Sequence, residues 1–366
     1  MGFLFKRCDR FLLLLILVIV GAGVVMVYSS SSAWSMYKFD DSFYYAKRQL
    51  LFAGLGIAMM ALVQRIPISF WDKYAYHIYI ACLICMAAVL IPGVGMVRGG
   101  ARSWIGIGIF SIQPAEFMKL GVILALARFL ATNYKDVQSF QRVFLPALVM
   151  TILPFLLIML QPDLGTGTVL FGTGMVLLVI AGSRMRYFFA LAGLALAGLV
   201  GLIASAPYRI DRLTAYLNPW EDPLGTGFQI IQSLYAVGPG GLFGTGLGRS
   251  IQKYYYLPEP QTDFIFSVIA EELGFIGAST LLALFFLLMW RGFITAIYSP
   301  DMFSSFIAAG VVGMVVIQVG INISVVIGLI PVTGITLPLI SYGGSSLTVT
   351  LASLGLVLRV SGNAKN

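Results

Sequence analysis

Hydrophobic residues along this chain fall into ten long runs that are separated by polar segments, most of them short. The runs lie near residues 11–30, 47–64, 74–91, 113–131, 144–160, 165–182, 187–205, 263–290, 303–327 and 340–360. A bilayer core of about 30 Å requires about 20 apolar residues in a helix, and the runs are about that long. The pattern therefore predicts an all-α, polytopic integral membrane protein with about ten transmembrane helices in a single domain, residues 1–366.

The composition agrees with a membrane protein and argues against a soluble one. Of the 366 residues, 59% are hydrophobic and 10% are charged, and the mean hydropathy is +0.93. The net charge of +8 is spread too thinly for nucleic-acid binding, so no nucleic-acid partner is expected. A basic flank precedes the first run. Because further runs follow, we interpret this run as an uncleaved first helix and not as a signal peptide.

Positively charged residues indicate how the helices are oriented. An even number of helices places both termini on one side of the membrane. The short loops on that side hold thirteen of the 23 Lys and Arg residues, among them Lys135, Arg142, Arg184 and Arg186. Since such residues concentrate in cytoplasmic loops, we expect both termini in the cytoplasm. Nine cations remain on the outer side, which is more than orientation requires.

The largest hydrophilic segment, about residues 207–262, lies between the seventh and eighth helices and is expected to face outward. Phe228, Ile231, Leu234 and Tyr235 follow helical spacing, and the segment is rich in Trp and Tyr, so we expect it to lie on the outer membrane surface. Its glycine-rich part, residues 238–248, lacks the G-x-G-x-x-G spacing and the preceding strand of a nucleotide site. We interpret it as a set of tight turns.

Asp263 stands where the chain enters the eighth apolar run, after the Pro-Glu-Pro turn at residues 258–260. An acidic residue at this position is costly, which favours a function. The positive end of a helix dipole favours the ionised form of this carboxylate. The carboxylate could accept a proton from a hydroxyl nucleophile or hold a divalent cation. The alternative is structural, because Thr262 and Asp263 are both good N-capping residues. The residues alone leave these two interpretations equal.

Other charged residues lie inside the apolar runs or just outside them. Glu116 and Lys119 are three residues apart in the fourth run, on one helix face, so they can form an ion pair. Such a pair either joins helices or lines a polar cavity that opens outward, where Arg102 and Trp104 are expected. Asp163 lies in a short outer turn beside glycines, and the turn alone could explain it.

Four parts of the sequence carry a resemblance to a known family. They are residues 102–119 (RSWIGIGIFSIQPAEFMK), 161–167 (QPDLGTG), 215–248 together with 252–274, and 328–346 (GLIPVTGITLPLISYGGSS). In this order they resemble the SEDS family (FtsW/RodA/SpoVE), bacterial membrane proteins of shape, elongation, division and sporulation. The segments NPWEDPLGTGFQIIQSLYAVGPGGLFG and YLPEPQTDFIF are most similar to the sporulation members.

The resemblance implies an inverting peptidoglycan glycosyltransferase that polymerises lipid II into glycan strands on the outer face of the cytoplasmic membrane. It implies that Asp263 is the catalytic aspartate and that a central cavity leads to it. The implied partner is a class B penicillin-binding protein, and the implied role is spore cortex synthesis or division, at the corresponding septum. No organic cofactor is expected, whereas a divalent cation, Mg²⁺ or Mn²⁺, could bind with Asp263 as a ligand.

Further polar residues on the outer side are expected to bind the substrate. Lys47 and Arg48 begin the second helix, where cations oppose both the helix dipole and the orientation rule. An anion should therefore compensate them, either a lipid pyrophosphate or the headgroup of an ordinary phospholipid. The expected substrate-binding residues are Lys47, Arg48, Arg102, Trp104, Glu116, Lys119, Asp163, Glu259 and Thr262.

Two other functions fit a helical bundle with intramembrane charges. One is a lipid II flippase, which would need broken helices and alternating access. The other is a scaffold that activates a penicillin-binding protein and needs no carboxylate for chemistry. The sequence contains no clear pair of Gly- or Pro-interrupted helices in matching halves, and the large outer loop with its carboxylate favours the enzyme.

Overall fold

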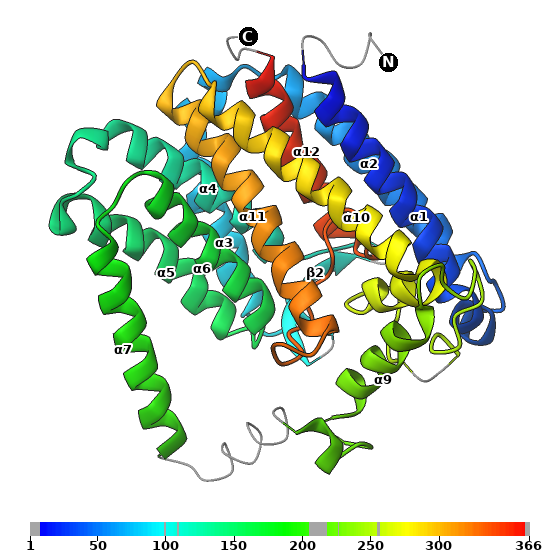
Figure 1. Cartoon of the computed structure of the whole chain (residues 1–366). Coiled ribbons are helices and arrows are strands. Elements are labelled where there is room, and N and C mark those ends of the chain that lie inside the picture. Colours follow the sequence, from blue (N-terminus) through cyan, green and yellow to red (C-terminus); the bar gives the residue numbers. More distant parts are fainter. Residues whose placement is uncertain are drawn as a thin grey trace.

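The chain folds into a bundle of long helices, as the computed structural model shows (Figure 1). The structure describes residues 8–98, 100–107, 110–204, 218–225, 227–254 and 257–362. Each of the ten predicted runs corresponds to a helix, which confirms the all-α membrane fold. These helices are α1 (Arg10–Phe39), α2 (Tyr44–Arg65), α3 (Ile68–Val89), α4 (Pro114–Thr132), α5 (Leu145–Met159), α6 (Leu164–Ile180), α7 (Met185–Ala204), α10 (Ile265–Ile297), α11 (Met302–Val326) and α12 (Gly344–Ser361).

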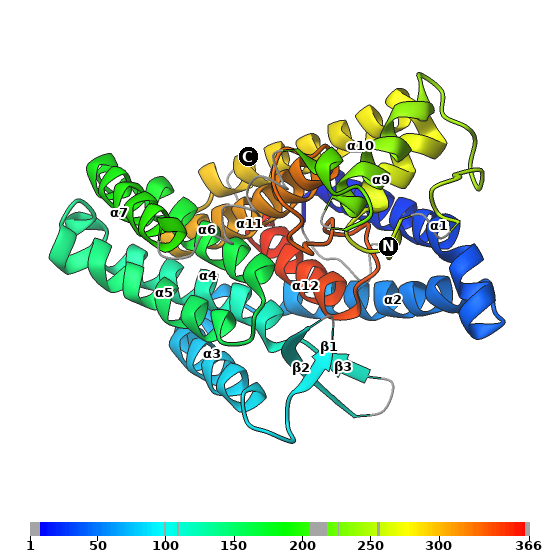
Figure 2. The same ribbon diagram turned by 90° about the horizontal axis from the view of Figure 1, so that it is seen from below.

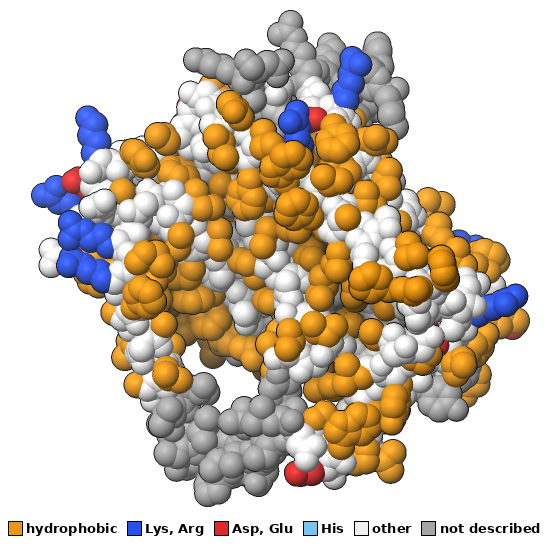
Figure 3. All heavy atoms as spheres, in the orientation of Figure 1, with side chains coloured by type: hydrophobic (Ala, Val, Ile, Leu, Met, Phe, Trp, Pro, Cys, Tyr) orange, Lys and Arg blue, Asp and Glu red, His pale blue; other side chains and the backbone are white. Residues whose placement is uncertain are grey.

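The described helices have the length and surface of membrane-spanning elements. Six of them are long and apolar enough to cross a membrane by length and composition: α1, α2, α5 with the π-helical turn before it, α10, α11 and α12. Figure 3 shows hydrophobic side chains over the middle of one face, with Lys and Arg at its periphery. This distribution suits a protein whose middle is surrounded by lipid.

The helix boundaries differ from the predicted ones at two places that have a physical reason. α1 continues to Phe39, well past the predicted end at residue 30, although it enters a serine-rich stretch. There Ser30 and Ser31 donate hydrogen bonds to the carbonyl oxygen of Val27, so their hydroxyls are satisfied within the helix. α12 starts at Gly344 and not at residue 340, because Gly343 is extended (φ 178°).

A small antiparallel sheet between α3 and α4 was not predicted. It contains β1 (Met96–Arg98), β2 (Ala101–Ile107) and β3 (Phe110–Ile112) in the order β1-β2-β3. β2 pairs with β3 through Ile105 and Ile112, and with β1 through Arg102 and Val97. The sheet lies at one edge of the bundle, beside α3 and the start of α12 (Figure 2).

The outer segment is only partly helical. Residues 205–217 lie outside the described residues, and with them part of the predicted loop 207–262. The described part contains the 3₁₀ turns Pro219–Glu221 and Gly238–Gly240 and the helix α9 (Phe228–Val237), which packs on α10 and α11. The tight turns predicted after α9 are confirmed, because Gly241, Gly244, Gly246 and Gly248 all have positive φ.

These turns fill a break in α10. Gly274, inside the helix, has φ 67° and ψ −167°, which interrupts the helical hydrogen bonds. The amides of Thr245 and Gly246 donate to the carbonyl oxygens of Glu271 and Glu272 at 2.9 and 3.0 Å. The amides of residues 275 and 276 donate in turn to residues 241 and 242. The loop thus satisfies backbone groups that the break leaves unpaired.

The described ends of the chain lie at the same end of the bundle (Figure 1). The amide of Asp9 donates to the hydroxyl of Ser361 at 3.0 Å, and Arg291 of α10 pairs with the Asp9 carboxylate. The described ends of the chain are therefore held together at one end of the bundle.

Candidate active site around Asp263

Asp263 precedes α10 and does not cap it. The helix begins at Ile265, its N-cap residue is Phe264, and no side chain forms a capping hydrogen bond there. The capping interpretation of Asp263 and Thr262 is therefore wrong, because neither residue occupies the position that capping requires. Asp263 is half-buried. A half-buried carboxylate with no capping role is the starting point of the site.

The backbone around Asp263 is held by two segments that are distant in sequence. On α11, Asn322 Nδ2 donates to the carbonyl oxygens of Asp263 (2.7 Å) and Ile335 (2.8 Å). The Ser341 hydroxyl donates to the Thr262 carbonyl oxygen at 2.6 Å, and the amide of residue 342 donates to the carbonyl oxygen of residue 261 at 2.8 Å. The segment 335–342 before α12 therefore fixes the position of Asp263.

The Asp263 carboxylate faces the turn at Gly334. A Cβ atom on Gly334 would lie 3.9 Å from Oδ2 of Asp263, and Gly334 has φ +69°. Burial raises the pKa of Asp263 above its usual value. The Thr262 hydrogen bond opposes this effect, and the nearby charge of Glu259 adds to it. A general base is most effective when its pKa lies near the working pH, so the raised pKa of Asp263 suits this role.

Glu259 and Thr262 lie beside Asp263, on the same turn. The Thr262 hydroxyl donates to the Glu259 carbonyl oxygen at 2.8 Å and lies 3.4 Å from its carboxylate. Glu259 is exposed, and its φ of +45° marks a tight turn. The structure thus brings these three predicted site residues together, with the carboxylates of Asp263 and Glu259 on the same turn before α10.

Oxygen atoms around Asp263 suit a hard divalent cation. Three buried oxygens in the surrounding segments have no hydrogen-bond partner among the described residues: Oε1 of Gln261, Oδ1 of Asn322 and Oγ1 of Thr333. The described residues contain no group of three or more His, Cys, Asp or Glu side chains that could hold a metal. Mg²⁺ is commonly bound by one or two carboxylates together with substrate phosphates, so Asp263 and Glu259 fit such a cation.

Asp163 belongs to the same end of the bundle and caps α6. Its carboxylate accepts the amide of Thr166 at 3.1 Å and Nε2 of Gln113 at 2.7 Å, while the amide of Gln113 donates to Ser345 on α12. A Cβ atom on Gly165 would lie 2.4 Å from the carbonyl oxygen of residue 333, which explains the glycine. Asp163 therefore joins the start of α4 to the start of α6, while the adjacent Gly165 packs against the segment that faces Asp263.

Glu116 and Lys119 form the predicted ion pair on α4. Lys119 Nζ lies 2.8 Å from a carboxylate oxygen of Glu116, and the two side chains are 1% and 7% exposed. Glu116 lies in the first turn of the helix, where an acidic residue is favourable. Burial of both partners supports the structural interpretation of the pair over a solvent-filled cavity.

The remaining predicted residues lie on α2 and in the sheet. Lys47 is 68% exposed and pairs with Asp41 at 2.8 Å, and its hydrogen bond lowers the pKa of Asp41. The anion expected to compensate Lys47 is therefore supplied by the protein itself. Arg48 stacks on the ring of Tyr44, 4.2 Å from its centroid. Arg102, opposite Val97, and Trp104, opposite Met96, both lie on β2, where Arg102 is exposed.

The sequence did not reveal the polar cluster that anchors the outer loop. Lys253 pairs with Glu272 at 3.0 Å, and the Ile251 amide donates to Glu271 at 2.7 Å. Ser29 of α1 and Ser250 donate hydroxyl hydrogen bonds to Glu272 and Glu271. Two adjacent glutamates, Glu271 and Glu272, inside an apolar run are the signal by which the sequence could have indicated this cluster. Asn322 gave a weaker signal, as a single amide within an apolar helix.

Comparison with known proteins agrees with this architecture. A family model described as "Cell cycle protein" (FtsW/RodA/SpoVE) matches residues 9–366. The chain is 58% identical to stage V sporulation protein E of Bacillus subtilis over 353 residues, which cover 96% of each chain. It is 43% identical to a probable peptidoglycan glycosyltransferase FtsW of Geobacter metallireducens over 360 residues, 98% of this chain and 96% of that one.

Solved structures show the same fold. One is a chain of a peptidoglycan synthase complex described for its coordination of polymerisation and crosslinking; the TM-score is 0.81 at 36% identity, with 98% of both chains covered. Another is the rod shape determining protein RodA of Thermus thermophilus; the TM-score is 0.72 at 33% identity, with 99% of both chains covered. A variant of that RodA with an aspartate replaced by alanine is equally similar, at a TM-score of 0.72.

Proposed function

This chain belongs to the FtsW/RodA/SpoVE family of cell cycle proteins, and from that membership and the site geometry we propose how it acts and on what. It is a peptidoglycan glycosyltransferase and a multi-pass protein of the cytoplasmic membrane. Its substrate is lipid II, which it polymerises into glycan strands at the outer face of that membrane, with both termini in the cytoplasm. The single observation that carries the proposal is the half-buried carboxylate of Asp263, which has no capping role and whose backbone is held by distant segments of the chain.

Asp263 is the general base of the reaction. It removes the proton from the 4-hydroxyl of the acceptor sugar, and this oxygen attacks the anomeric carbon of the donor. The bond to undecaprenyl pyrophosphate breaks, and a single displacement inverts the anomeric carbon. Pyrophosphate is a good leaving group, so no second acid is required, unlike in glycosidases. The raised pKa of Asp263 favours proton transfer from a hydroxyl.

A divalent cation, Mg²⁺ or Mn²⁺, fits beside this base. Asp263 and Glu259 would hold it, and the unpaired oxygens of Asn322 and Thr333 are the neutral oxygens available nearby. When bound, the cation offsets the charge that develops on the pyrophosphate. Thr262 orients Glu259 through its hydrogen bonds.

The partner is a transpeptidase, a class B penicillin-binding protein. The similarity to a chain of a complex that coordinates polymerisation with crosslinking supports this assignment. The 58% identity to a stage V sporulation protein supports a role in spore cortex synthesis at the sporulation septum, ahead of a role in division.

The break in α10 gives no support to the flippase alternative. In α10 the gap at Gly274 is filled by backbone of the chain's own loop, residues 241–246, and not by a passage for substrate. A scaffold needs no carboxylate for chemistry, so it gives no reason for a half-buried carboxylate on a backbone that distant segments hold.

The test is glycan polymerisation from purified lipid II in liposomes, with a divalent cation and the cognate transpeptidase present. Asp263→Asn is compared with the wild type and with Glu221→Gln, which removes a carboxylate from the same outer loop, where Glu221 bonds only its neighbour Asn218 among the described residues. We expect polymer from the wild type and Glu221→Gln and none from folded Asp263→Asn. Equal polymer from Asp263→Asn would remove this residue from catalysis. No polymer from any protein, with translocation of lipid II, would establish the flippase.

A further inference from the structure

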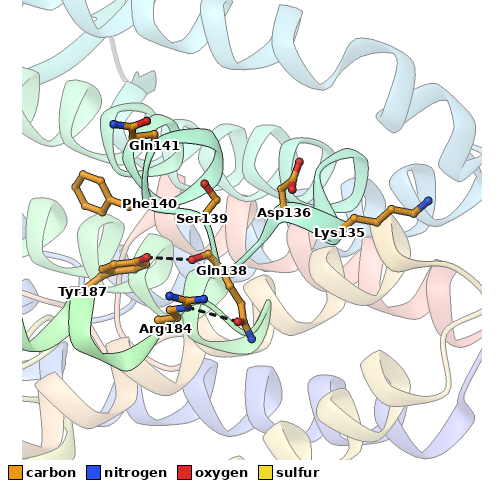
Figure 4. A pocket seen from close by; sticks show the side chains of 8 residues that line it. All are labelled: Lys135, Asp136, Gln138, Ser139, Phe140, Gln141, Arg184 and Tyr187. Atoms are coloured by element: carbon orange, nitrogen blue, oxygen red, sulfur yellow. Dashed lines mark hydrogen bonds between the residues drawn. The ribbon is translucent and has the colours of Figure 1, made fainter.

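Figure 4 shows a hollow of about 490 Å³. It lies at the end of α4 that is remote from Asp263. It is formed by the connection between α4 and α5 and by the turn between α6 and α7. Its lining residues are Lys135, Asp136, Gln138, Ser139, Phe140, Gln141, Arg184 and Tyr187. α4 begins beside the candidate active site and ends beside this hollow, so the two sites lie on opposite sides of the membrane.

The charge of the hollow is positive. Lys135 and Arg184 line it, and Arg142 and Arg186 flank it. Its carboxylate, Asp136, already pairs with Arg142 at 3.3 Å. Among the described residues, Lys135, Arg184 and Arg186 have no carboxylate within ion-pair distance, so an anion placed here would meet cations that the fold leaves uncompensated.

Hydrogen bonds hold the two walls of the hollow together. The Tyr187 hydroxyl donates to the Gln138 carbonyl oxygen at 3.0 Å, and Arg184 Nε donates to Oε1 of the same residue at 3.4 Å. Arg186 donates to the Tyr187 hydroxyl at 3.2 Å. As Figure 4 shows, Arg184 and Tyr187 both reach toward Gln138 from the α7 side. The site therefore exists before a ligand arrives, which reduces the ordering that binding requires.

Apolar surface adjoins the cations on the membrane side. Phe140 is 43% exposed, and on the first turns of α7 Met185 is 51% and Phe189 is 71% exposed. Phe140, Phe144 and Tyr187 have ring centroids within 5.8 Å of one another. The turn Phe140–Phe144 is a π-helix, a form that is frequent at functional sites. A soluble anion would contact only the cations, whereas a phospholipid would contact the cations with its headgroup and the apolar surface with its acyl chains.

We propose that this hollow binds the phosphate headgroup of an anionic phospholipid of the cytoplasmic leaflet, with the acyl chains lying against Phe140 and Phe189. Lys135 and Arg184 contact the phosphate, and Ser139 and Gln141 offer further hydrogen-bonding groups. Basic pockets between helices on this side of a membrane bind such lipids, and each cation contributes about fivefold to affinity near the surface. The site is separate from the reaction proposed for Asp263.

The experiment measures lipid binding to the purified full-length protein in detergent by native mass spectrometry. The probes are phosphatidylglycerol, phosphatidylcholine of the same chain length, and inorganic phosphate as a competitor. We expect the wild type to bind phosphatidylglycerol in preference to phosphatidylcholine. Lys135→Gln should weaken that binding about fivefold and Lys135→Gln/Arg184→Gln about 25-fold. Both side chains are exposed, so the variants should fold, and size-exclusion profiles check this.

The control, Arg65→Gln/Lys73→Gln, removes two other cations at the same end of the bundle, one from the last residue of α2 and one from the first turns of α3. We expect it to retain wild-type affinity. If the control lost as much affinity for phosphatidylglycerol as Lys135→Gln/Arg184→Gln, the binding would reflect general attraction between charges, and the proposal would be overturned. Equal binding of phosphatidylglycerol and phosphatidylcholine would also overturn the proposal, and an acidic partner protein would then be the next candidate ligand. Displacement of the lipid by millimolar phosphate would assign the site to a free anion.

Discussion

Lys253 and Glu272 form a buried ion pair that joins the outer loop to α10. Their side chains are 2% and 0% exposed, and Nζ lies 3.0 Å from Oε1. The adjacent Glu271 is also buried and accepts the amide of Ile251 and the hydroxyl of Ser250. The cluster therefore holds two carboxylates and one ammonium group. Replacing Lys253 with Met would leave both carboxylates without a cation.

The size of the effect follows from the distance and the burial. At 3.0 Å and an effective dielectric constant of about 20, two unit charges attract with about 5.5 kcal/mol. Breaking a buried pair by removing one partner costs about 3–5 kcal/mol, because the other charge stays buried. We therefore expect Lys253→Met to lower the free energy of unfolding by about 3–5 kcal/mol. Lys253→Met/Glu272→Gln removes both charges, and we expect it to recover about 2–3 kcal/mol of that loss.

The assay is thermal unfolding of the purified protein in detergent, followed by tryptophan fluorescence, for the wild type, both single variants and the double variant. Arg142→Met is the matched control, because Arg142 and Asp136 form an exposed pair (72% and 51%) whose loss should cost less than about 1 kcal/mol. The reasoning fails if Lys253→Met is no less stable than Arg142→Met, or if the double variant is no more stable than Lys253→Met.

Three further predictions concern Asp263 and the break in α10. Because burial raises the pKa of Asp263, its base form is lost as the pH falls through a value above the ordinary 3.8, so the polymerisation rate should decline there. A raised pKa also means that the ionised carboxylate destabilises the folded state at neutral pH. Asp263→Asn removes this charge, so it should unfold at the same or a higher temperature than the wild type. A lower unfolding temperature would contradict the raised pKa. Gly244→Ala should destabilise more than Gly241→Ala in thermal unfolding. Both have positive φ, but only at Gly244 would a Cβ lie 2.2 Å from the Glu272 carbonyl oxygen.

The sequence predicted the helices well because a membrane span is a local property. About 20 consecutive apolar residues suffice, and neither the partner helices nor the contacts need to be known. The break at Gly274 could not be predicted in this way, because the groups that fill it belong to residues 241–246. The β-sheet at residues 96–112 was missed for a similar reason, since its short strands are defined by their pairing.

In the candidate site, too, the sequence predicted what depends on neighbouring residues and missed what depends on distant ones. Asp263 could be singled out from its position at the start of an apolar run, and Glu259 and Thr262 from their place beside it. The choice between capping and chemistry depended on where α10 begins, which the apolar pattern placed two residues too early. The partner that fixes the Asp263 backbone, Asn322, is 59 residues away in the chain, so only the folded structure brings it to the site.

The break at Gly274 divides α10 into two parts with different surroundings. Before Gly274, residues 265–272 are all buried within the protein, whereas after it Phe275, Phe286 and Trp290 are 67%, 64% and 54% exposed. Residues 275–297 alone extend about 35 Å at the helical rise, which is enough to cross the bilayer core. The first part is therefore not needed to cross the bilayer, and it holds the outer loop instead. It starts beside Asp263 and ends at Glu271 and Glu272, which bond residues of that loop. Because one continuous helical segment, residues 265–273, connects the anchor to the residue that follows Asp263 and Phe264, we expect a disturbance of the anchor at Lys253 to reach the proposed catalytic base as well.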